Sequence, residues 1–483
     1  MSVKRNTLYN LLGTIAPSFV SLVTVPAYLH LIGNARYGVL AIVWLFLGYF
    51  GLFDPGITRA AAFHISRLHK PEQAREREGV FWTALVVNLA FGIVGGVVLF
   101  FVARPIFMST FKMPESMRGE VIASLPWLAA SIPLLTTTGV LTGALQAREW
   151  FGVSNSINVA NAAVSQLVPL AVAYWMGPQL SYLIPATIIV RALGAAPTLI
   201  AVARALPLGM GAFFDRSQVK PLFSYGGWIT LTNVLNPVLS TMDRMLIGSL
   251  LSAEAVAFYT VPFNLVSRAS AVPGSLATTL FPKLSRGNLE DSARLASDAL
   301  AALASVTTPM CVLGIAALPI FMHYWVGASF AQNAAPVGVV VFVGIWINGL
   351  AYIPYSHLQA IGRPDIVAKF HTIEVVPFLG MLWLGLHFFG LVGCALAWTL
   401  RVSVDAILLF VVAGKTPGWQ RLIPGLILVI IAAPLAPTAI LSFKTPAEIG
   451  LLIIAAIWAW KLSPQVQSTL RSRIQFLRAR TAL

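Results

Sequence analysis

Residues 225–283 read YGGWITLTNVLNPVLSTMDRMLIGSLLSAEAVAFYTVPFNLVSRASAVPGSLATTLFPK, and this stretch decides the class of the protein. It consists of two apolar runs joined by a short turn, each long enough to cross a bilayer. The runs nevertheless carry Asp243, Arg244 and Arg268. Because an ionised side chain at the centre of a bilayer costs about 2.5–3.5 kcal/mol on insertion scales, such residues usually face other helices, water or a ligand. The stretch therefore predicts two membrane helices with a polar role.

Polar side chains recur at helical spacing in both runs. In the first, Asn233 and Asn236 precede Asp243 on one face of the helix. In the second, Asn264 and Arg268 are four residues apart and share a face in the same way. These two polar stripes are predicted to face something other than lipid.

The composition of the whole chain agrees with a membrane protein. Of 483 residues, 58% are hydrophobic and 10% are charged, whereas soluble domains have about 25% charged residues. Cys311 and Cys394 lie in apolar runs, so neither a disulfide framework nor a zinc site is expected. The net charge of +15 fits cytoplasmic loops beside an anionic membrane surface, and no nucleic-acid partner is expected. An all-α polytopic membrane protein is predicted.

The chain contains about fourteen stretches of membrane-spanning length. They are residues 8–32, 38–64, 80–103, 121–145, 153–176, 181–204, 224–247, 256–281, 299–321, 335–359, 367–389, 391–412, 422–441 and 447–462. Lysines and arginines are concentrated in alternate connections, which predicts that both termini are cytoplasmic. The N-terminal run lacks a small-residue cleavage site, so it is expected to remain as the first helix.

Two short sequences repeat at nearly one offset. Residues 31–33 recur as 246–248, and residues 145–147 recur as 358–360. The repeats predict two six-helix lobes related by a pseudo-two-fold axis along the membrane normal, followed by two extra C-terminal helices. The expected parts are an N-terminal lobe (1–205), a cytoplasmic linker (206–221), a C-terminal lobe (222–413), helices 13 and 14 (414–462) and a basic amphipathic tail (463–483).

Three arginines within predicted helices are candidate anion ligands. Arg268 lies near the middle of its helix, where exposure to lipid is costly, so a ligand or an ion pair is expected. Arg191 also lies near mid-helix. Arg59 is closer to a helix end, where a role as an anchor among the lipid headgroups is an equally good explanation.

Two further pairs of charged residues invite opposite interpretations. Asp243 and Arg244 are adjacent, so their side chains point about 100° apart and are expected to find partners elsewhere. Arg401 and Asp405 are one turn apart, which predicts an ion pair within a single helix.

Amide and aromatic side chains form other stripes. Asn158 and Asn161 share one edge of the fifth predicted helix, and Asn348 and Tyr352 lie one turn apart in the tenth. Such residues often join membrane helices by hydrogen bonds. The alternative is that they line a wet cavity suited to sugar hydroxyls.

Motifs of catalysis are missing from the sequence. It contains no phosphate-binding Walker loop, no metal-spaced His or Cys pair and no nucleophile elbow. The protein is therefore predicted not to be an enzyme, and any driving force must come from an ion gradient, the membrane potential or removal of product.

The sequence resembles the Wzx-type polysaccharide flippases of the multidrug, oligosaccharidyl-lipid and polysaccharide exporter superfamily. The residues that carry the resemblance are Asn6, Asn10, Pro26, 31–33, Tyr37, Gly38, 52–57, 243–248, Tyr259 and 281–285. The resemblance implies two lobes arranged in a V, alternating access, and transfer of an undecaprenyl-diphosphate-linked oligosaccharide to the outer leaflet of the bacterial inner membrane. The product would serve O-antigen, capsule or exopolysaccharide assembly.

The resemblance also gives roles to particular residues. Arg268, Arg59, Arg244 and Arg191 would bind the diphosphate, because the guanidinium fork matches phosphate oxygens. The sugar would lie along the stripes of Asn158, Asn161, Asn233, Asn236, Asn264, Asn348 and Tyr352. No cofactor is implied. Coupling to H⁺ or Na⁺ stays open, and the candidate residues for it are Asp54, Asp243 and Glu374. Association with the polysaccharide polymerase and chain-length proteins also stays open.

Three alternatives remain at this stage. A cation-coupled multidrug exporter and a lipid II flippase belong to the same superfamily. Lipid II flippases carry an arginine in the first helix of the cavity, whereas this chain has no charged residue between Arg5 and Arg36. A membrane glycosyl polymerase or ligase is a different class and needs a sizeable outside loop, which the sequence does not offer.

Overall fold

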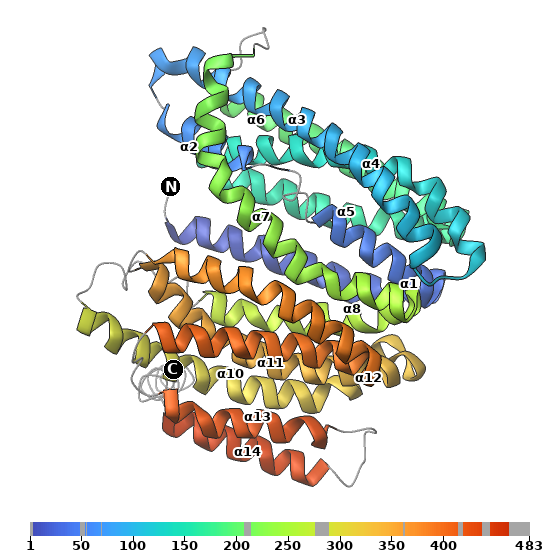
Figure 1. Cartoon of the computed structure of the whole chain (residues 1–483), viewed down its shortest axis with the longest axis vertical. Helices are drawn as coiled ribbons and strands as arrows, with labels where there is room; N and C mark the ends of the chain where they lie inside the picture. The colour runs from blue at the N-terminus through green and yellow to red at the C-terminus, as the bar shows by residue number, and fades with distance from the viewer. Residues whose placement is uncertain are drawn as a thin grey trace, which may run out of the picture. The chain divides into compact units, whose positions relative to one another are not determined.

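The computed structural model describes residues 3–48, 54, 56–68, 70–206, 214–275, 289–360, 363–413, 419–436 and 445–462. Within these residues every regular element is a helix (Figure 1). The chain divides into two compact units, Met1–Ala257 and Phe258–Leu483. The all-α prediction is confirmed.

The first unit contains seven long or medium helices and the start of an eighth. They are α1 (Val3–Gly48), α2 (Ile57–Arg67), α3 (Ala74–Pro105), α4 (Glu115–Ala147), α5 (Phe151–Met176), α6 (Leu180–Ala205), α7 (Arg216–Leu250) and the start of α8 (Ala253–Ser267), with the short η2 (Pro71–Gln73) and the π-helical η3 (Ile106–Thr110).

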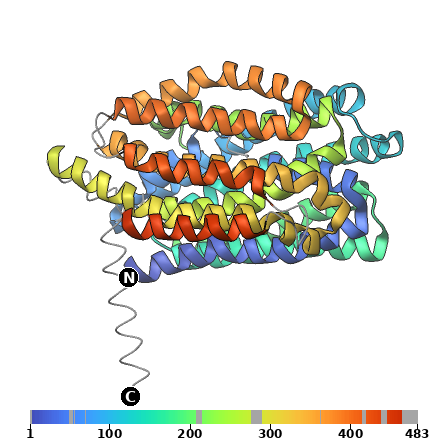
Figure 2. The same cartoon turned by 90° about the horizontal axis from the view of Figure 1, so that it is seen from below.

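The second unit contains the end of α8 and the remaining helices. These are η4 (Arg268–Ser270), α10 (Leu289–Val326), α11 (Ala328–Ala360), α12 (Pro364–Val412), η5 (Trp419–Leu422), α13 (Ile423–Leu435) and α14 (Thr445–Leu462). In the described residues each of the fourteen predicted stretches falls mainly on helix, and seven helices are long and apolar enough to span a membrane. Figure 2 shows them from a second direction.

Two of the longest helices are bent at glycines. Gly33 in α1 has φ 78°, and Gly390 in α12 has φ 57°. Backbone in this left-handed region is accessible to glycine without steric cost. Each bend separates two stretches that the sequence predicts as separate helices.

The second predicted helix, residues 38–64, is not continuous. α1 ends at Gly48, and α2 begins at Ile57 after Gly56, which has φ 75°. The sequence explains the interruption, since Pro55 cannot donate a backbone hydrogen bond and Gly56 adopts a conformation that ends a right-handed helix. The expectation of one unbroken helix is wrong here.

The core of the first unit lies where α2, α3, α4 and α6 meet. Ile57, Phe81, Ala144 and Val202 are fully buried there, and Leu222 from the start of α7 joins them. In contrast, one side of α3 exposes large apolar side chains, as expected for a helix that faces lipid tails.

Helix α7 packs against α2 and α3 of the first unit. At its start, the N–H of Asp215 donates a 2.9 Å hydrogen bond to the hydroxyl of Thr83 in α3. The described part of α7 is thus attached to the preceding helices, although it follows the predicted linker. The division into lobes at residues 206–221 stays a prediction.

In the second unit, α11 packs between α10 and α12. Ala351 and Leu358 of α11 are buried against Ala406 and Leu409 of α12. This packing holds the two segments of α12, on either side of Gly390, against a common neighbour.

Candidate substrate site

The guanidinium of Arg191 lies beside the interruption between α1 and α2. Its Nη1 donates a 3.4 Å hydrogen bond to the carbonyl oxygen of Leu47, in the last turn of α1. Its Nε is buried and has no hydrogen-bond partner among the described residues. Since an arginine has five N–H donors, most of this donor capacity is not used by the described part of the chain.

The charge of Arg191 is also poorly compensated. The residue is half-buried, and no described carboxylate forms an ion pair with it. A half-buried cation in this setting favours the binding of an anion.

Discontinuous helices line the substrate and ion sites of many transporters. In this chain the second predicted helix is discontinuous, and Arg191 of α6 contacts the end of its first part. This region of the first unit is the candidate anion site.

Asp54 lies in the same interruption and has a structural role. Its carboxylate is 5% exposed, and Oδ1 accepts a 3.3 Å hydrogen bond from the N–H of Thr58 in the first turn of α2. An acid at this position satisfies a free N–H group and stabilises the helix N-terminus. A role for Asp54 in cation coupling stays a prediction.

Asp243 and Arg244 pair with each other, so the expectation that their directions on the helix prevent this pair is wrong. Arg244 Nη1 lies 2.6 Å from Asp243 Oδ2, and the N–H of Arg244 donates to Asp243 Oδ1 at 2.8 Å. The side chains are only 4% and 1% exposed. The long arginine side chain bends around the helix to reach its neighbour because both charges are otherwise buried. Arg244 is therefore already neutralised in this state.

Arg268 lies at a change of helix type. α8 ends at Ser267, and Arg268 begins the 3₁₀ turn η4. Pro273, four residues after Ala269, cannot donate to that carbonyl, which loosens the α-helical pattern. The predicted continuous helix 256–281 is therefore irregular at Arg268, whose side chain is exposed.

The other predicted contacts differ in burial. Asn161 Nδ2 donates a 3.0 Å hydrogen bond to the carbonyl oxygen of Gly194, so it joins α5 to α6. Arg59, Asn158 and Asn264 are exposed. Asn348 and Tyr352 are half-buried on α11, while the side chains of Asn233 and Asn236 lie outside the described residues.

Glu374 lies in a cluster of charged residues on α12. Arg401 Nη1 is 3.6 Å from Glu374 Oε2, and His371 Nε2 is 3.8 Å from Asp405 Oδ1. The predicted pair of Arg401 with Asp405 is wrong, because the bend at Gly390 brings the earlier segment of α12 within reach of both residues.

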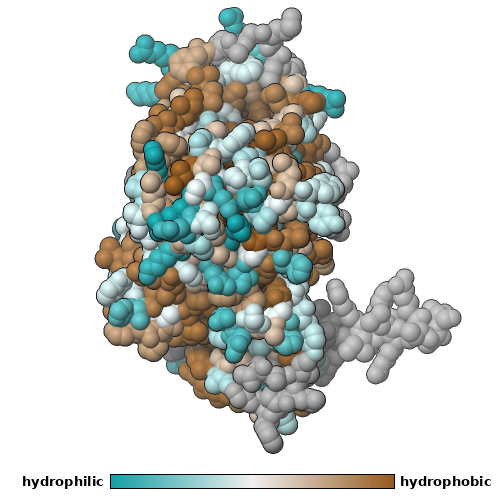
Figure 3. All heavy atoms as spheres, turned by 90° about the vertical axis from the view of Figure 1, so that its right-hand side faces the viewer, coloured by the Kyte–Doolittle hydropathy of each residue, from teal (hydrophilic) through white to brown (hydrophobic). Residues whose placement is uncertain are grey.

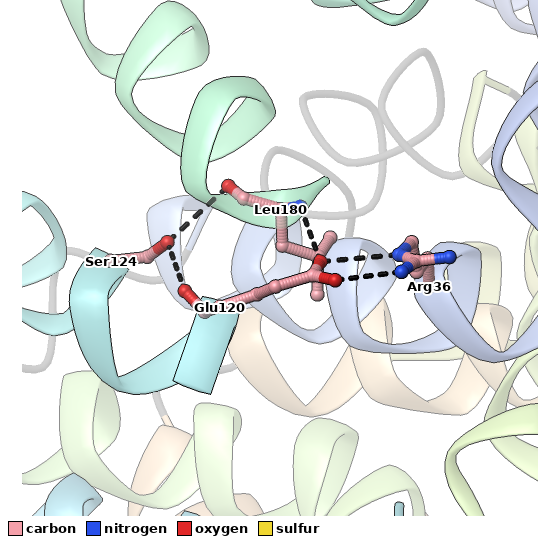
Figure 4. A network of polar contacts seen from close by, with 4 residues as sticks. All are labelled: Arg36, Glu120, Ser124 and Leu180. Carbon is pink, nitrogen blue, oxygen red and sulfur yellow. Dashed lines mark hydrogen bonds and ion pairs between the residues drawn. The ribbon is translucent and has the colours of Figure 1, made fainter. Parts of the chain in front are cut away.

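A second polar network joins three helices of the first unit (Figure 4). Glu120 of α4 accepts two hydrogen bonds from Arg36 of α1, at 2.6 and 3.1 Å, and another from the N–H of Leu180 at the start of α6, at 2.8 Å. Ser124 donates to the carbonyls of Glu120 and Leu180. The carboxylate of Glu120 raises the pKa of Arg36 above its ordinary value. We call these four residues the Glu120 network.

The turn between α7 and α8 is held by the connection that precedes α4. The N–H of Lys112 donates to the carbonyl of Gly248, and the N–H of Ala253 donates to the carbonyl of Lys112, each at 2.9 Å. Lys112 Nζ also donates to Leu250 at 2.6 Å. These contacts close the end of the first unit opposite to Asp215. Figure 3 views the helix ends on the right of Figure 1 and shows hydrophilic side chains gathered between apolar ones.

Arg36 and Lys112 were not among the residues predicted from the sequence to form a site. Each of them pairs with the end of another helix, Arg36 near the start of α4 and Lys112 at the end of α7. The sequence does not show which helix ends meet in space, so it gave no signal for these contacts. His371 was missed because a single histidine in an apolar run gives no information about its neighbours.

Comparisons with known proteins identify the family of the chain. A family model described as "Polysaccharide biosynthesis protein" matches residues 3–288, more than half of the chain. The chain belongs to the polysaccharide biosynthesis protein family. The protein named "Putative O-antigen transporter" of Shigella flexneri is 26% identical to it over 411 residues, which are 85% of this chain and 97% of that protein.

Two solved structures share the fold of this chain. The structure titled "Lipid II flippase MurJ, inward closed conformation" matches 93% of this chain and 98% of its own, with TM-score 0.71 and 14% identity. An inward-facing multidrug resistance MATE family transporter of the MOP superfamily matches 86% and 94%, with TM-score 0.65 and 14% identity. These similarities concern the fold, and the predicted fold class is confirmed.

Proposed function

We propose that this protein is a flippase that moves an undecaprenyl-diphosphate-linked oligosaccharide from the inner to the outer leaflet of the bacterial inner membrane. Membership of the polysaccharide biosynthesis protein family supports a role in polysaccharide assembly. The similarity to a protein named as an O-antigen transporter, along nearly its full length, supports transport of the lipid-linked precursor. Both termini would face the cytoplasm, as the distribution of lysines and arginines predicts.

The observation that carries the proposal is the half-buried guanidinium of Arg191, with its buried Nε, at the interrupted second helix. A diphosphate presents negatively charged oxygens in the geometry that a guanidinium binds best. The anion would compensate the charge of Arg191 and use its Nε. Arg268 and Arg59, exposed in their own units, are proposed as further contacts, whereas Arg244 would first have to leave Asp243.

The rest of the substrate is accommodated by other chemistry. The amide stripes would hold sugar hydroxyls by hydrogen bonds. The polyprenyl chain would stay in the lipid during the transfer, so no apolar surface of the chain would be exposed to water. Association with the polymerase and chain-length proteins remains part of the proposal.

The proposal is tested in liposomes that contain the purified protein and an undecaprenyl-diphosphate oligosaccharide. Exposure of the sugar in the outer leaflet is followed with an added lectin or glycosidase. The wild-type protein should transfer the lipid, and Arg191→Gln should slow the transfer at least about tenfold, since a charged hydrogen bond contributes about 1.5–3 kcal/mol. The matched control is Arg204→Gln, an exposed arginine in the last turn of the same helix. Transfer at the wild-type rate by Arg191→Gln contradicts its role, and absence of transfer by the wild type contradicts the function.

A further inference from the structure

Four titratable or charged residues meet on the two segments of α12. His371 and Glu374 are three residues apart in the segment before Gly390, and Arg401 and Asp405 are four apart in the segment after it. Each pair therefore lies on one helical face. We call these four residues the α12 cluster.

In the α12 cluster the two acids are buried, His371 and Arg401 are half-buried, and the four residues are loosely paired. The side chains of Glu374 and Asp405 are 7% and 10% exposed. The two ion pairs, at 3.6 and 3.8 Å, are longer than charge-assisted hydrogen bonds. Both carboxylate oxygens of Glu374 are buried without a hydrogen-bond partner among the described residues. An ionised carboxylate in this position is poorly satisfied.

Counting charges leads to the same conclusion. With both acids ionised and the imidazole neutral, two negative charges face the single positive charge of Arg401. The cluster then carries one uncompensated negative charge in a segment of membrane-spanning length. Such a charge is costly, and Glu374 and Asp405 also repel each other as interacting neighbours.

No described group on the neighbouring helix balances this charge. α11 packs along α12 and offers Tyr352, Tyr355 and His357 as its titratable groups in this part of the unit. The tyrosines are neutral near pH 7, and His357 is itself buried. At the start of α12, Asp365 is paired with Arg363 and Lys369. The one positive charge left over there lies on exposed side chains in water, where it is screened.

We propose that His371, Glu374 and Asp405 together bind one exchangeable proton, held either on the imidazole or between the two carboxyl groups. A proton restores neutrality without requiring additional ligands. A sodium ion fits less well, because Arg401 lies 3.6 Å from Glu374 and would repel it. The two other acids predicted as candidates for cation coupling have partners of their own: Asp54 accepts a hydrogen bond from the first turn of α2, and Asp243 is in its ion pair.

The proton would control contacts between the two segments of α12. When Glu374 is ionised, its attraction to Arg401 holds the segments together around the bend at Gly390. When it is protonated, this attraction falls to that of a neutral hydrogen bond. Coupling of this change to transport rests on the proposed flippase function, whereas the proton site does not.

The site is tested by pH-difference infrared spectroscopy on the full-length protein in lipid nanodiscs. The wild type should show the carbonyl band of a protonated carboxyl group that disappears as the pH rises. The double variant Glu374→Gln/Asp405→Asn should lose this band while keeping the wild-type elution volume and helical content. Glu448→Gln, at another buried acid of the same unit, should keep it. The proposal is overturned by a wild type without a titrating carboxyl band, or by a band that persists in the double variant.

Coupling is tested in the liposome assay with an imposed pH gradient, with a sodium gradient as the comparison. The wild-type rate should increase several-fold with the pH gradient only, and Glu374→Gln should not respond to it. An equal response of Glu374→Gln, or a response of the wild type to sodium instead, overturns the coupling. A wild type that transfers no oligosaccharide contradicts the proposed function, and the infrared result still decides the proton site.

Discussion

Arg36 and Glu120 form a two-bond ion pair that joins α1 to α4, and the same carboxylate receives the first N–H of α6 from Leu180. One acid near the start of α4 thus joins the start of α6 to the part of α1 that follows its bend at Gly33. Helix N-termini carry unsatisfied N–H groups and a partial positive charge. The carboxylate of Glu120 therefore stabilises the N-terminus of α6 in addition to pairing with Arg36. The Glu120 network defines one end of the first unit.

Replacing Glu120 by glutamine should destabilise the first unit by about 2 kcal/mol, because the charge-assisted bonds to Arg36 become neutral ones. The measurement is the free energy of unfolding in detergent micelles. Glu115→Gln is the matched control, an exposed acid in the first turn of the same helix, and should cost less than about 1 kcal/mol. Equal effects of the two variants would argue against the network.

The pair of Arg36 and Glu120 should not weaken at alkaline pH. Because the pKa of Arg36 is raised, the arginine remains charged at every pH below the ordinary pKa of an arginine. Raising the pH to 10 should therefore leave the pair intact.

Gly38 marks the closest approach of α1 to the start of α8. A methyl group at this position would overlap the carbonyl oxygen of Ala253. Gly38→Ala should therefore destabilise the protein by about 1–3 kcal/mol, the usual cost of overpacking. Gly119→Ala, where a methyl group meets open space, should be neutral or stabilise by up to about 1 kcal/mol. Melting temperatures of the two variants in the same detergent decide the matter, and an unchanged value for Gly38→Ala would refute the close contact.

The pair of Asp243 and Arg244 should show strong coupling. Asp243→Asn alone leaves a buried arginine without its carboxylate and should cost about 3–5 kcal/mol. Arg244→Gln alone should also be destabilising. The double variant should cost clearly less than the sum of the two, since no uncompensated charge remains. The double-mutant cycle is measured by unfolding in denaturing detergent, and additive effects would show that the two residues act independently.

The start of α7 should respond to acid. Asp215 accepts hydrogen bonds from the N–H and hydroxyl of Ser217, and these lower the pKa of its carboxyl group. A lowered pKa means that the stabilising effect is complete above the ordinary value of about 3.9 and is lost as the pH falls through the lowered value. Hydrogen exchange at the Ser217 amide should therefore remain slow down to pH 4 after correction for intrinsic rates, and increase in stronger acid. The amide side chain introduced in Asp215→Asn still caps the helix but does not titrate, so the increase in exchange should be absent from this variant. If both proteins respond equally to acid, a group other than Asp215 causes the response.

The sequence by itself determined the all-α membrane class and the positions of the helices. Long apolar runs can satisfy their backbone hydrogen bonds in lipid only as helices, so residues 153–176 and 181–204 correspond closely to α5 and α6. The interruption before α2 was also encoded by Pro55 and Gly56, but the strong apolar pattern on both sides concealed it.

Only the tertiary structure decided which charged residues meet. Sequence spacing favoured Arg401 with Asp405, while the bend at Gly390 placed Glu374 beside Arg401. Spacing likewise argued against Asp243 with Arg244, because it describes the direction of Cβ and not the reach of a flexible arginine. Periodicity gives the face of a helix, whereas the partner of a buried charge depends on the helix that the fold brings against that face.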